Sequence, residues 1–231
     1  MTDRPIIFSA PMIRALLAEA KEPGTGKSMT RRLLYSQRDA KAGIIPGSAT
    51  FLHPYPQPRL DTSRHPIGTY WTLSPWYRAR AGDRLWVKET WQKHHSYATL
   101  EDAARAGPLM GALYRATHGP NNLPLKWRPS IYMPRVHSRL TLVVTATKIE
   151  RLQEISEQDC EREGLVWCPM NKIWGVKVEG GYSPYGLTAQ ECFMNLFCDL
   201  HGPHVWADNP WVVALTFAVR HQNIDAMKEA A

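Results

Sequence analysis

Alternating apolar and polar residues predict the strands of this chain. The clearest alternation lies within residues 138–147, where leucine, valine and alanine at even positions are separated mostly by threonine. Residues 211–219 place large apolar side chains at every second position, which is the period of a half-buried strand. Apolar segments at 6–8 and 84–91 predict two more strands, the second of which follows a turn at 81–83.

Capping residues and helical periodicity predict three main helices. Ser9 precedes a segment whose apolar residues recur at helical spacing. Ser156 and Thr188 are each followed, three positions later, by an acidic residue, as in a helix-capping box. A fourth, shorter helix is expected at 100–106.

Two long segments have no clear period. Residues 37–78 are rich in proline, and residues 93–128 form a second irregular region. We expect both to be insertions in a single domain that spans residues 1–231. Separated strands with few helices predict an α+β fold, in the form of a mixed β-barrel with flanking helices.

Net charge narrows the class of partner. The chain has 231 residues and a formal net charge of +7, which favours a polyanion such as RNA. Nine tryptophans supply aromatic faces on which bases can stack. No run of about 18 apolar residues is present, so we expect no transmembrane helix and no membrane partner. We also expect no signal peptide and a cytoplasmic location. The sequence does not indicate an oligomeric state.

Cysteine and histidine spacing argues against a metal. None of the four cysteines forms a Cys-x-x-Cys pair, and reduced thiols are expected. Cys198, His201 and His204 are close in sequence but lack a second pair of ligands. We therefore expect no metal and no other cofactor.

Residues 23–28, Pro-Gly-Thr-Gly-Lys-Ser, are similar to the end of a phosphate-binding Walker A loop. The first glycine of that motif would fall on position 21, which is Lys21. The loop also follows a predicted helix, whereas a Walker A loop follows a buried strand. These two departures argue against an ATPase or GTPase.

The order of segments 6–32, 81–91, 138–164 and 209–219 resembles the ASCH family. Residues 127–134 resemble those of larger ASCH-containing proteins from bacteriophages and prophages. The resemblance implies a PUA-like β-barrel with a cleft for a nucleoside or RNA. Some small bacterial ASCH proteins are amidohydrolases that deacylate acetylated cytidine.

The resemblance also implies site residues. The reacting lysine, threonine and glutamate of those amidohydrolases correspond to Lys27, Thr30 and Glu163, and a family arginine corresponds to Arg32. A threonine hydroxyl needs a base, and burial lowers the pKa of a lysine enough to supply one. Residues three apart share a face on a turn or helix but not on a strand, so this chemistry favours a turn or helix at 27–30. Arg31 is a further candidate for binding phosphate.

Two other residues are candidates for binding substrate. Glu89 shares a strand face with apolar residues, and an acid in that position needs a partner. The structural alternative is an ion pair between Glu89 and a nearby arginine. Trp86 is a candidate wall of the cleft, with core packing as its alternative.

Three functions remain open from the sequence. The first is an amidohydrolase acting on N4-acylated cytidine-type nucleosides, with Thr30 as nucleophile and Lys27 as base. The second is a non-catalytic RNA-binding module or a ribonuclease. The third is a phage structural or host-interaction protein, because a fold does not dictate a function. If the protein is not a hydrolase, we expect Lys27 and Thr30 to be ordinary residues of a solvated loop.

Overall fold

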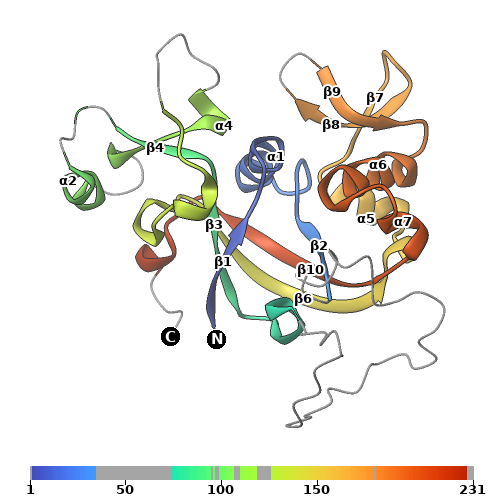
Figure 1. Ribbon diagram of the computed structural model, residues 1–231, viewed down its shortest axis with the longest axis horizontal. Helices are drawn as coiled ribbons and strands as arrows, with labels where there is room; N and C mark the ends of the chain where they lie inside the picture. Colours follow the sequence, from blue (N-terminus) through green and yellow to red (C-terminus); the bar gives the residue numbers. More distant parts are fainter. Residues whose placement is uncertain are drawn as a thin grey trace, which may run out of the picture.

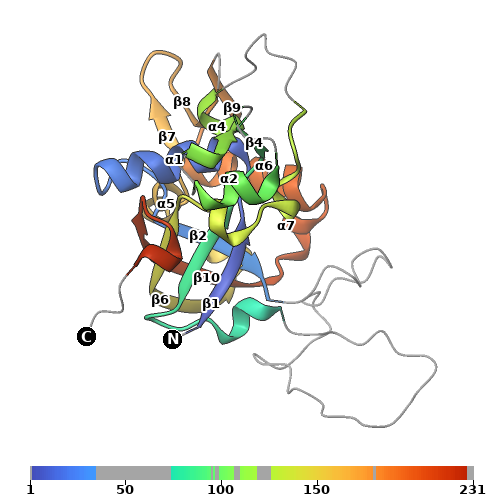
Figure 2. The same ribbon diagram turned by 90° about the vertical axis from the view of Figure 1, so that its left-hand side faces the viewer.

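Figures 1 and 2 show the chain in a computed structural model that describes residues 2–34, 74–94, 96, 99–106, 110–118, 126–178 and 181–227. Most of the predicted insertion at 37–78 lies outside these residues. Its last part, Pro75–Arg78, forms a 3-10 turn. Further 3-10 turns cover Ser130–Tyr132, Arg135–His137, Leu152–Glu154 and Ile224–Ala226.

The main sheet has five strands in the order β1-β3-β6-β10-β2. β1 runs parallel to β3, and every other neighbouring pair is antiparallel. The strands are β1 (Asp3–Ile7), β2 (Met29–Leu33), β3 (Arg84–Lys88), β6 (Thr141–Arg151) and β10 (Trp211–Arg220). The predicted strands at 138–147 and 211–219 are thus confirmed as the two long inner strands, with shifted ends.

The strand predicted at 84–91 is shorter than expected. β3 ends at Lys88, and β4 (Trp91–Lys93) pairs instead with β5 (Ala112–Tyr114) in a separate two-stranded sheet. Trp91 is buried in a second apolar cluster with Ala112, Tyr114 and Met133. Packing in this cluster explains why the chain leaves the main sheet after Lys88.

Three helices begin where their capping residues predict. They are α1 (Ala10–Lys21), α5 (Glu157–Arg162) and α6 (Ala189–His201). The hydroxyls of Ser156 and Thr188 accept hydrogen bonds from the backbone of Asp159 and Glu191, at 3.2 and 3.1 Å. Ser9 occupies the N-cap position of α1 without such a bond.

The smaller elements form two groups on either side of α1 (Figure 1). One group holds α2 (Leu100–Arg105), β4, β5 and α4 (Arg115–His118). The other is a three-stranded sheet of β7 (Val166–Cys168), β8 (Ile173–Val178) and β9 (Gly181–Gly186), which packs on α6. The short helix α7 (Val205–Asp208) follows α6. The predicted irregular region at 93–128 therefore contains short elements.

A single side chain links the two edges of the main sheet. Arg32 lies on the edge strand β2, and its Nη2 donates a hydrogen bond of 2.7 Å to the carbonyl oxygen of Ile7 on the opposite edge strand, β1. The sheet therefore curls strongly, although its described strands do not close into a hydrogen-bonded ring. The predicted α+β class is confirmed. Within the described residues, no helix has both the length and the apolar character needed to cross a membrane.

Candidate functional site

The loop between α1 and β2 holds Lys27 against the helix. The backbone N–H of Lys27 donates to the carbonyl oxygen of Ala15, at 3.1 Å. A Cβ atom at Gly26 would overlap that same oxygen, so only glycine lets the loop lie this close. Of the two glycines in this loop, Gly26 therefore serves to pack it on α1, whereas Gly24 takes a positive φ of 88°.

Lys27 and Glu163 meet in a buried ion pair. The Lys27 ammonium donates to Oε2 of Glu163 at 2.5 Å and to its backbone carbonyl oxygen at 2.7 Å. Burial lowers the pKa of Lys27, and the negative charge of Glu163 opposes this shift only in part. A lowered pKa increases the fraction of neutral amine, which is the form that can accept a proton.

The end of α5 places Glu163. This residue is the C-cap of α5, and its N–H donates to the carbonyl oxygen of Asp159 at 2.9 Å. Gly164 then takes a positive φ of 96°, which ends the helix. A Cβ at Gly164 would lie 3.3 Å from Cβ of Lys27, so this glycine also allows the close approach of the two segments.

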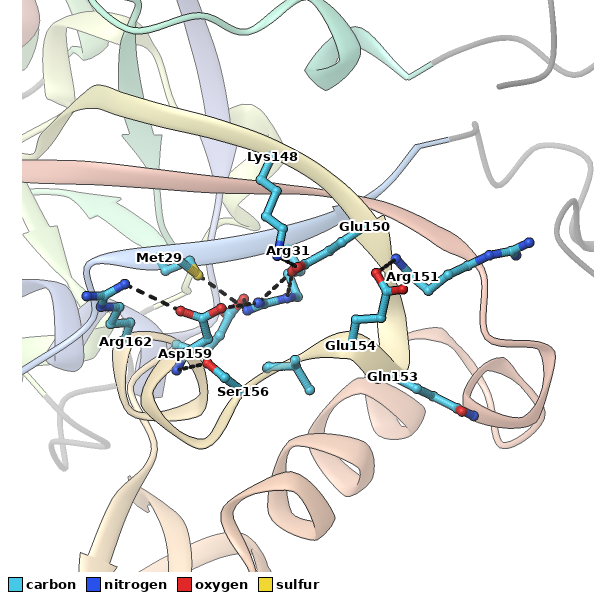
Figure 3. Close-up of polar contacts among 12 residues, drawn as sticks. Met29, Arg31, Lys148, Glu150, Arg151, Gln153, Glu154, Ser156, Asp159 and Arg162 are labelled. Atoms are coloured by element: carbon cyan, nitrogen blue, oxygen red, sulfur yellow. Dashed lines mark hydrogen bonds and ion pairs between the residues drawn. The ribbon is translucent and has the colours of Figure 1, made fainter. Parts of the chain in front are cut away.

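Arg31 connects Glu163 to two more carboxylates. Figure 3 shows these two, Glu150 and Asp159, beside Arg31. Its guanidinium donates to Glu150 Oε1 through Nε at 2.8 Å and to Asp159 Oδ2 through Nη2 at 2.8 Å. Its Nη1 lies 3.4 Å from Oε1 of Glu163. Burial lowers the pKa of Arg31, but Glu163 and Glu150 outweigh burial and raise it overall. We call Lys27, Arg31, Glu150, Asp159 and Glu163 the Arg31 cluster.

Two surface cations border the Arg31 cluster (Figure 3). The ammonium of Lys148 lies 2.6 Å from Oε2 of Glu150, and its side chain is 67% exposed. Nη1 of Arg162 lies 3.4 Å from Oδ1 of Asp159. The cluster therefore extends from a buried centre to solvent on this side.

The segment at 27–30 is not the predicted turn or helix, because Thr30 already belongs to strand β2. Alternation along a strand places Thr30 and Arg32 on one face and Arg31 on the other. The Phe8 ring lies 5.9 Å from Nζ of Lys27 and 5.0 Å from Cζ of Arg32, so it neighbours both cations. Thr30 therefore shares the Phe8 side of β2 with Arg32 and the Lys27 ammonium.

Two cations bind the carboxylate of Glu163. The Lys27 ammonium binds Oε2, and Nη1 of Arg31 lies 3.4 Å from Oε1.

Thr30 is buried in the same region without a bond to the pair. Lys27, Thr30 and Glu163 are 2%, 4% and 3% exposed. Within the described ranges, no hydrogen bond joins the Thr30 hydroxyl to another residue. A substrate can reach these side chains only if neighbouring residues move.

One N–H group of the Arg32 guanidinium has no hydrogen-bond partner among the described residues. Its Nη2 binds Ile7, but its Nε is buried without a partner among the described residues. Burial lowers the pKa of Arg32, with partial compensation by Glu163. The positive charge of Arg32 also acts on His201 at the end of α6. Burial and Arg32 together lower the pKa of His201 to about 4.

Glu89 and Trp86 lie apart from this region. Oε1 and Oε2 of Glu89 accept hydrogen bonds of 2.8 and 2.9 Å from the guanidinium of Arg139, which confirms the ion pair considered as the alternative for Glu89. Arg139 also lies over the Tyr114 ring, 4.0 Å from its centroid. We call Glu89 and Arg139 the Arg139 pair. Trp86 is half-buried on β3 beside the ammonium of Lys88, and no described contact joins it to the Arg31 cluster.

Sequence reasoning missed part of the cluster. Glu150 lies at the end of a long strand, where an acid is ordinarily solvated, and Asp159 reads as a favourable charge in the first turn of a helix. Both instead hold Arg31. The only signal was the pair of adjacent arginines, Arg31 and Arg32, in a short segment that becomes a strand.

The cysteines do not add a nucleophile. All four are free thiols. Burial raises the pKa of Cys160 and of Cys192 to about 12, so both remain protonated near neutral pH. Among the described residues, no group of three or more histidine, cysteine, aspartate or glutamate side chains is arranged to hold a metal ion.

Comparison with known proteins adds no relative on which to base a family or an activity. No protein-family model matches the chain, and neither a curated protein nor a solved structure matches it.

Proposed function

We propose that this chain is an ASCH-type protein with a PUA-like barrel, and that it hydrolyses the acyl amide of an N4-acylated cytidine-type nucleoside. The observation that carries the proposal is the buried ion pair between Lys27 and Glu163, which lie 136 positions apart in sequence. These are the two positions that the resemblance to ASCH amidohydrolases pairs in one site. The link between Arg32 and Ile7 supports the barrel, because it joins the two edges of the curled sheet.

The arrangement supports acyl transfer to Thr30. The neutral amine of Lys27 takes the proton of the Thr30 hydroxyl as its oxygen bonds to the acyl carbon. The C–N bond of the tetrahedral intermediate then breaks, and the Lys27 ammonium returns the proton to the departing amino group. Water hydrolyses the resulting Thr30 ester and releases the acid.

Glu163 and Arg32 assist these steps. Glu163 holds the Lys27 amine by accepting two hydrogen bonds from its Nζ, one at the carboxylate and one at the backbone carbonyl oxygen. Arg32 Nε has no partner among the described residues and lies on the Thr30 side of β2. It is therefore the donor that we assign to the oxygen that becomes negative in the intermediate.

Release of cytidine from N4-acetylcytidine, followed by chromatography, tests the proposal. Thr30→Val removes the hydroxyl at nearly constant shape, and Lys27→Met removes the amine. Each should lower the rate at least about 100-fold, the usual scale for losing a catalytic base or its nucleophile. Lys148→Met, at the exposed edge of the Arg31 cluster, is the matched control and should retain the rate. Thermal melting of each variant separates lost chemistry from lost fold.

The pH dependence gives a second readout. Because burial lowers the pKa of Lys27, the rate should rise with pH and level off below pH 10.5, the ordinary value for lysine. Absence of cytidine release, or an unchanged rate in Thr30→Val, would refute the hydrolase. RNA binding that weakens with salt, without any release, would instead favour a binding module.

A further inference from the structure

A pocket of about 370 Å³ lies between α1, α4 and the sheet of β7, β8 and β9. Figures 1 and 2 both show α1 next to α4 and to β8, so the pocket has α1 along one side. Its volume falls near the lower end of the range for small-molecule sites. Its apolar walls are aliphatic: Pro11, Ala15 and Ala18 from α1, and Val166, Val176 and Val178 from the small sheet.

The hydroxyl groups in the pocket are already bonded within the protein. Thr25 donates to the carbonyl oxygen of Glu22 at 2.7 Å. Thr117 lies 3.3 Å from the carbonyl oxygen of Tyr114 and accepts a bond from Arg139 at 3.3 Å. Since both hydroxyls have partners, neither is reserved for a ligand.

Two cations line the same pocket. Arg14 is half-buried, and its Nη1 makes one long bond of 3.3 Å to the carbonyl oxygen of Ala116. Lys177 is exposed at the rim. Within the described part of the chain, neither cation forms an ion pair with a carboxylate, and no acidic residue lines the pocket. The remaining N–H groups of Arg14 and Lys177 are thus the polar groups available to a bound molecule.

We propose that this pocket binds a small amphipathic carboxylate with an aliphatic chain, of the medium-chain fatty acid class. The valine and alanine walls remove the chain from water, which stabilises binding with each buried CH₂ group. The carboxylate binds Arg14 and Lys177, where charge-assisted hydrogen bonds replace contact with water.

A nucleobase fits this lining less well. No aromatic side chain lines the pocket for stacking. Reading a base edge needs paired donors and acceptors, and both threonine hydroxyls are already engaged. The pocket adjoins the proposed hydrolase site through Gly26 and Gly164, but neither Lys27 nor Glu163 lines it, so octanoate binding is a test separate from hydrolysis.

Isothermal titration calorimetry with octanoate and with octan-1-ol separates the contribution of the ligand's carboxylate to affinity from that of its aliphatic chain. Octanoate should bind at one site, roughly 25- to 100-fold more tightly than the alcohol, the scale expected for two charge-assisted interactions. Arg14→Gln and Lys177→Gln should each weaken octanoate binding roughly five- to tenfold and leave octan-1-ol unchanged. Lys126→Gln removes a positive charge outside the pocket and is the matched control, with octanoate affinity retained.

A variant that fills the pocket gives an independent test. Ala18→Phe places a ring in the pocket and should abolish binding of both octanoate and octan-1-ol, while circular dichroism reports whether the fold is kept. Equal affinity for the acid and the alcohol, no binding of octanoate, or unchanged binding in Arg14→Gln and Lys177→Gln would overturn the proposal. Displacement of octanoate by cytidine monophosphate would overturn it in favour of a nucleotide site.

Discussion

The Arg31 cluster and the Arg139 pair bury the same kinds of charge in different ways. Arg139 has one carboxylate, Glu89, which it binds through two parallel hydrogen bonds. Arg31 is shared by three carboxylates, one of which also binds Lys27. Arg139 and Glu89 each have one oppositely charged partner, whereas each bond of the cluster depends on the positions of several segments. In such a network the loss of one member affects several others, so its energy is not a sum of separate pairs.

Removing each central arginine should expose this difference most strongly. Arg31→Met leaves three carboxylates without their shared cation, and should lower the free energy of unfolding by about 5 kcal/mol. Arg139→Met leaves Glu89 alone and should cost about 3 kcal/mol. Urea denaturation measures both values, and Arg162→Met at the exposed edge is the control. An equal or smaller loss for Arg31→Met would mean that the cluster is no more interdependent than the pair.

A half-buried histidine beside Arg32, the neighbour of Arg31 on β2, gives a smaller effect that depends on pH. Burial and Arg32 lower the pKa of His201 to about 4, so between pH 6.5 and 4 the unfolded chain binds more protons than the folded one. Stability contributed by neutral His201 is therefore lost as pH falls through this window, by at most about 3 kcal/mol. His201→Gln should reduce this acid sensitivity in denaturation curves recorded from pH 7 to 4.

His221 is the matched residue beside the Arg139 pair. Burial and Arg139 lower its pKa as well, but its side chain lies at the surface. His221→Gln should therefore change the acid sensitivity less than His201→Gln does. A larger effect for His221→Gln would contradict the expectation that His201, which is more deeply buried, has the larger pKa shift.

The smallest effect is expected at the solvent edge of the cluster. Lys148 is 67% exposed although it lies 2.6 Å from Glu150. Water and salt screen such a pair, so Lys148→Met should change stability by less than about 1 kcal/mol. A large loss in the same urea assay would show that Lys148 is an integral partner of Glu150.

Some of this arrangement was predictable from sequence. The helix caps at Ser156 and Thr188 follow from local hydrogen bonding, which the sequence specifies directly. Lys27 and Glu163 were placed in one site through the resemblance to ASCH proteins, and they do meet. Thr30 was expected on a turn with Lys27, but it lies on β2.

The parts of the structure that the sequence did not predict depend on contacts between residues far apart in the chain. β2 has the sequence Met-Thr-Arg-Arg-Leu, in which polar residues point to both faces, so no apolar alternation reveals a strand. Arg31 is buried there only because Glu150 and Asp159 arrive from other segments. The strands β7, β8 and β9 were also missed, because their glycines and exposed aromatics do not form a regular alternation.

The distance along the chain between Lys27 and Glu163 has a consequence for synthesis on the ribosome. Lys27 emerges 136 residues before its carboxylate partner, and Arg31 emerges 119 residues before Glu150. Until α5 is translated, a nascent chain cannot bury these cations in their final positions, and β2 also lacks its strand partner in the described sheet until β10 has been made. β2 can therefore take its native place in the sheet only late in synthesis, after the segment that forms β10 has left the ribosome.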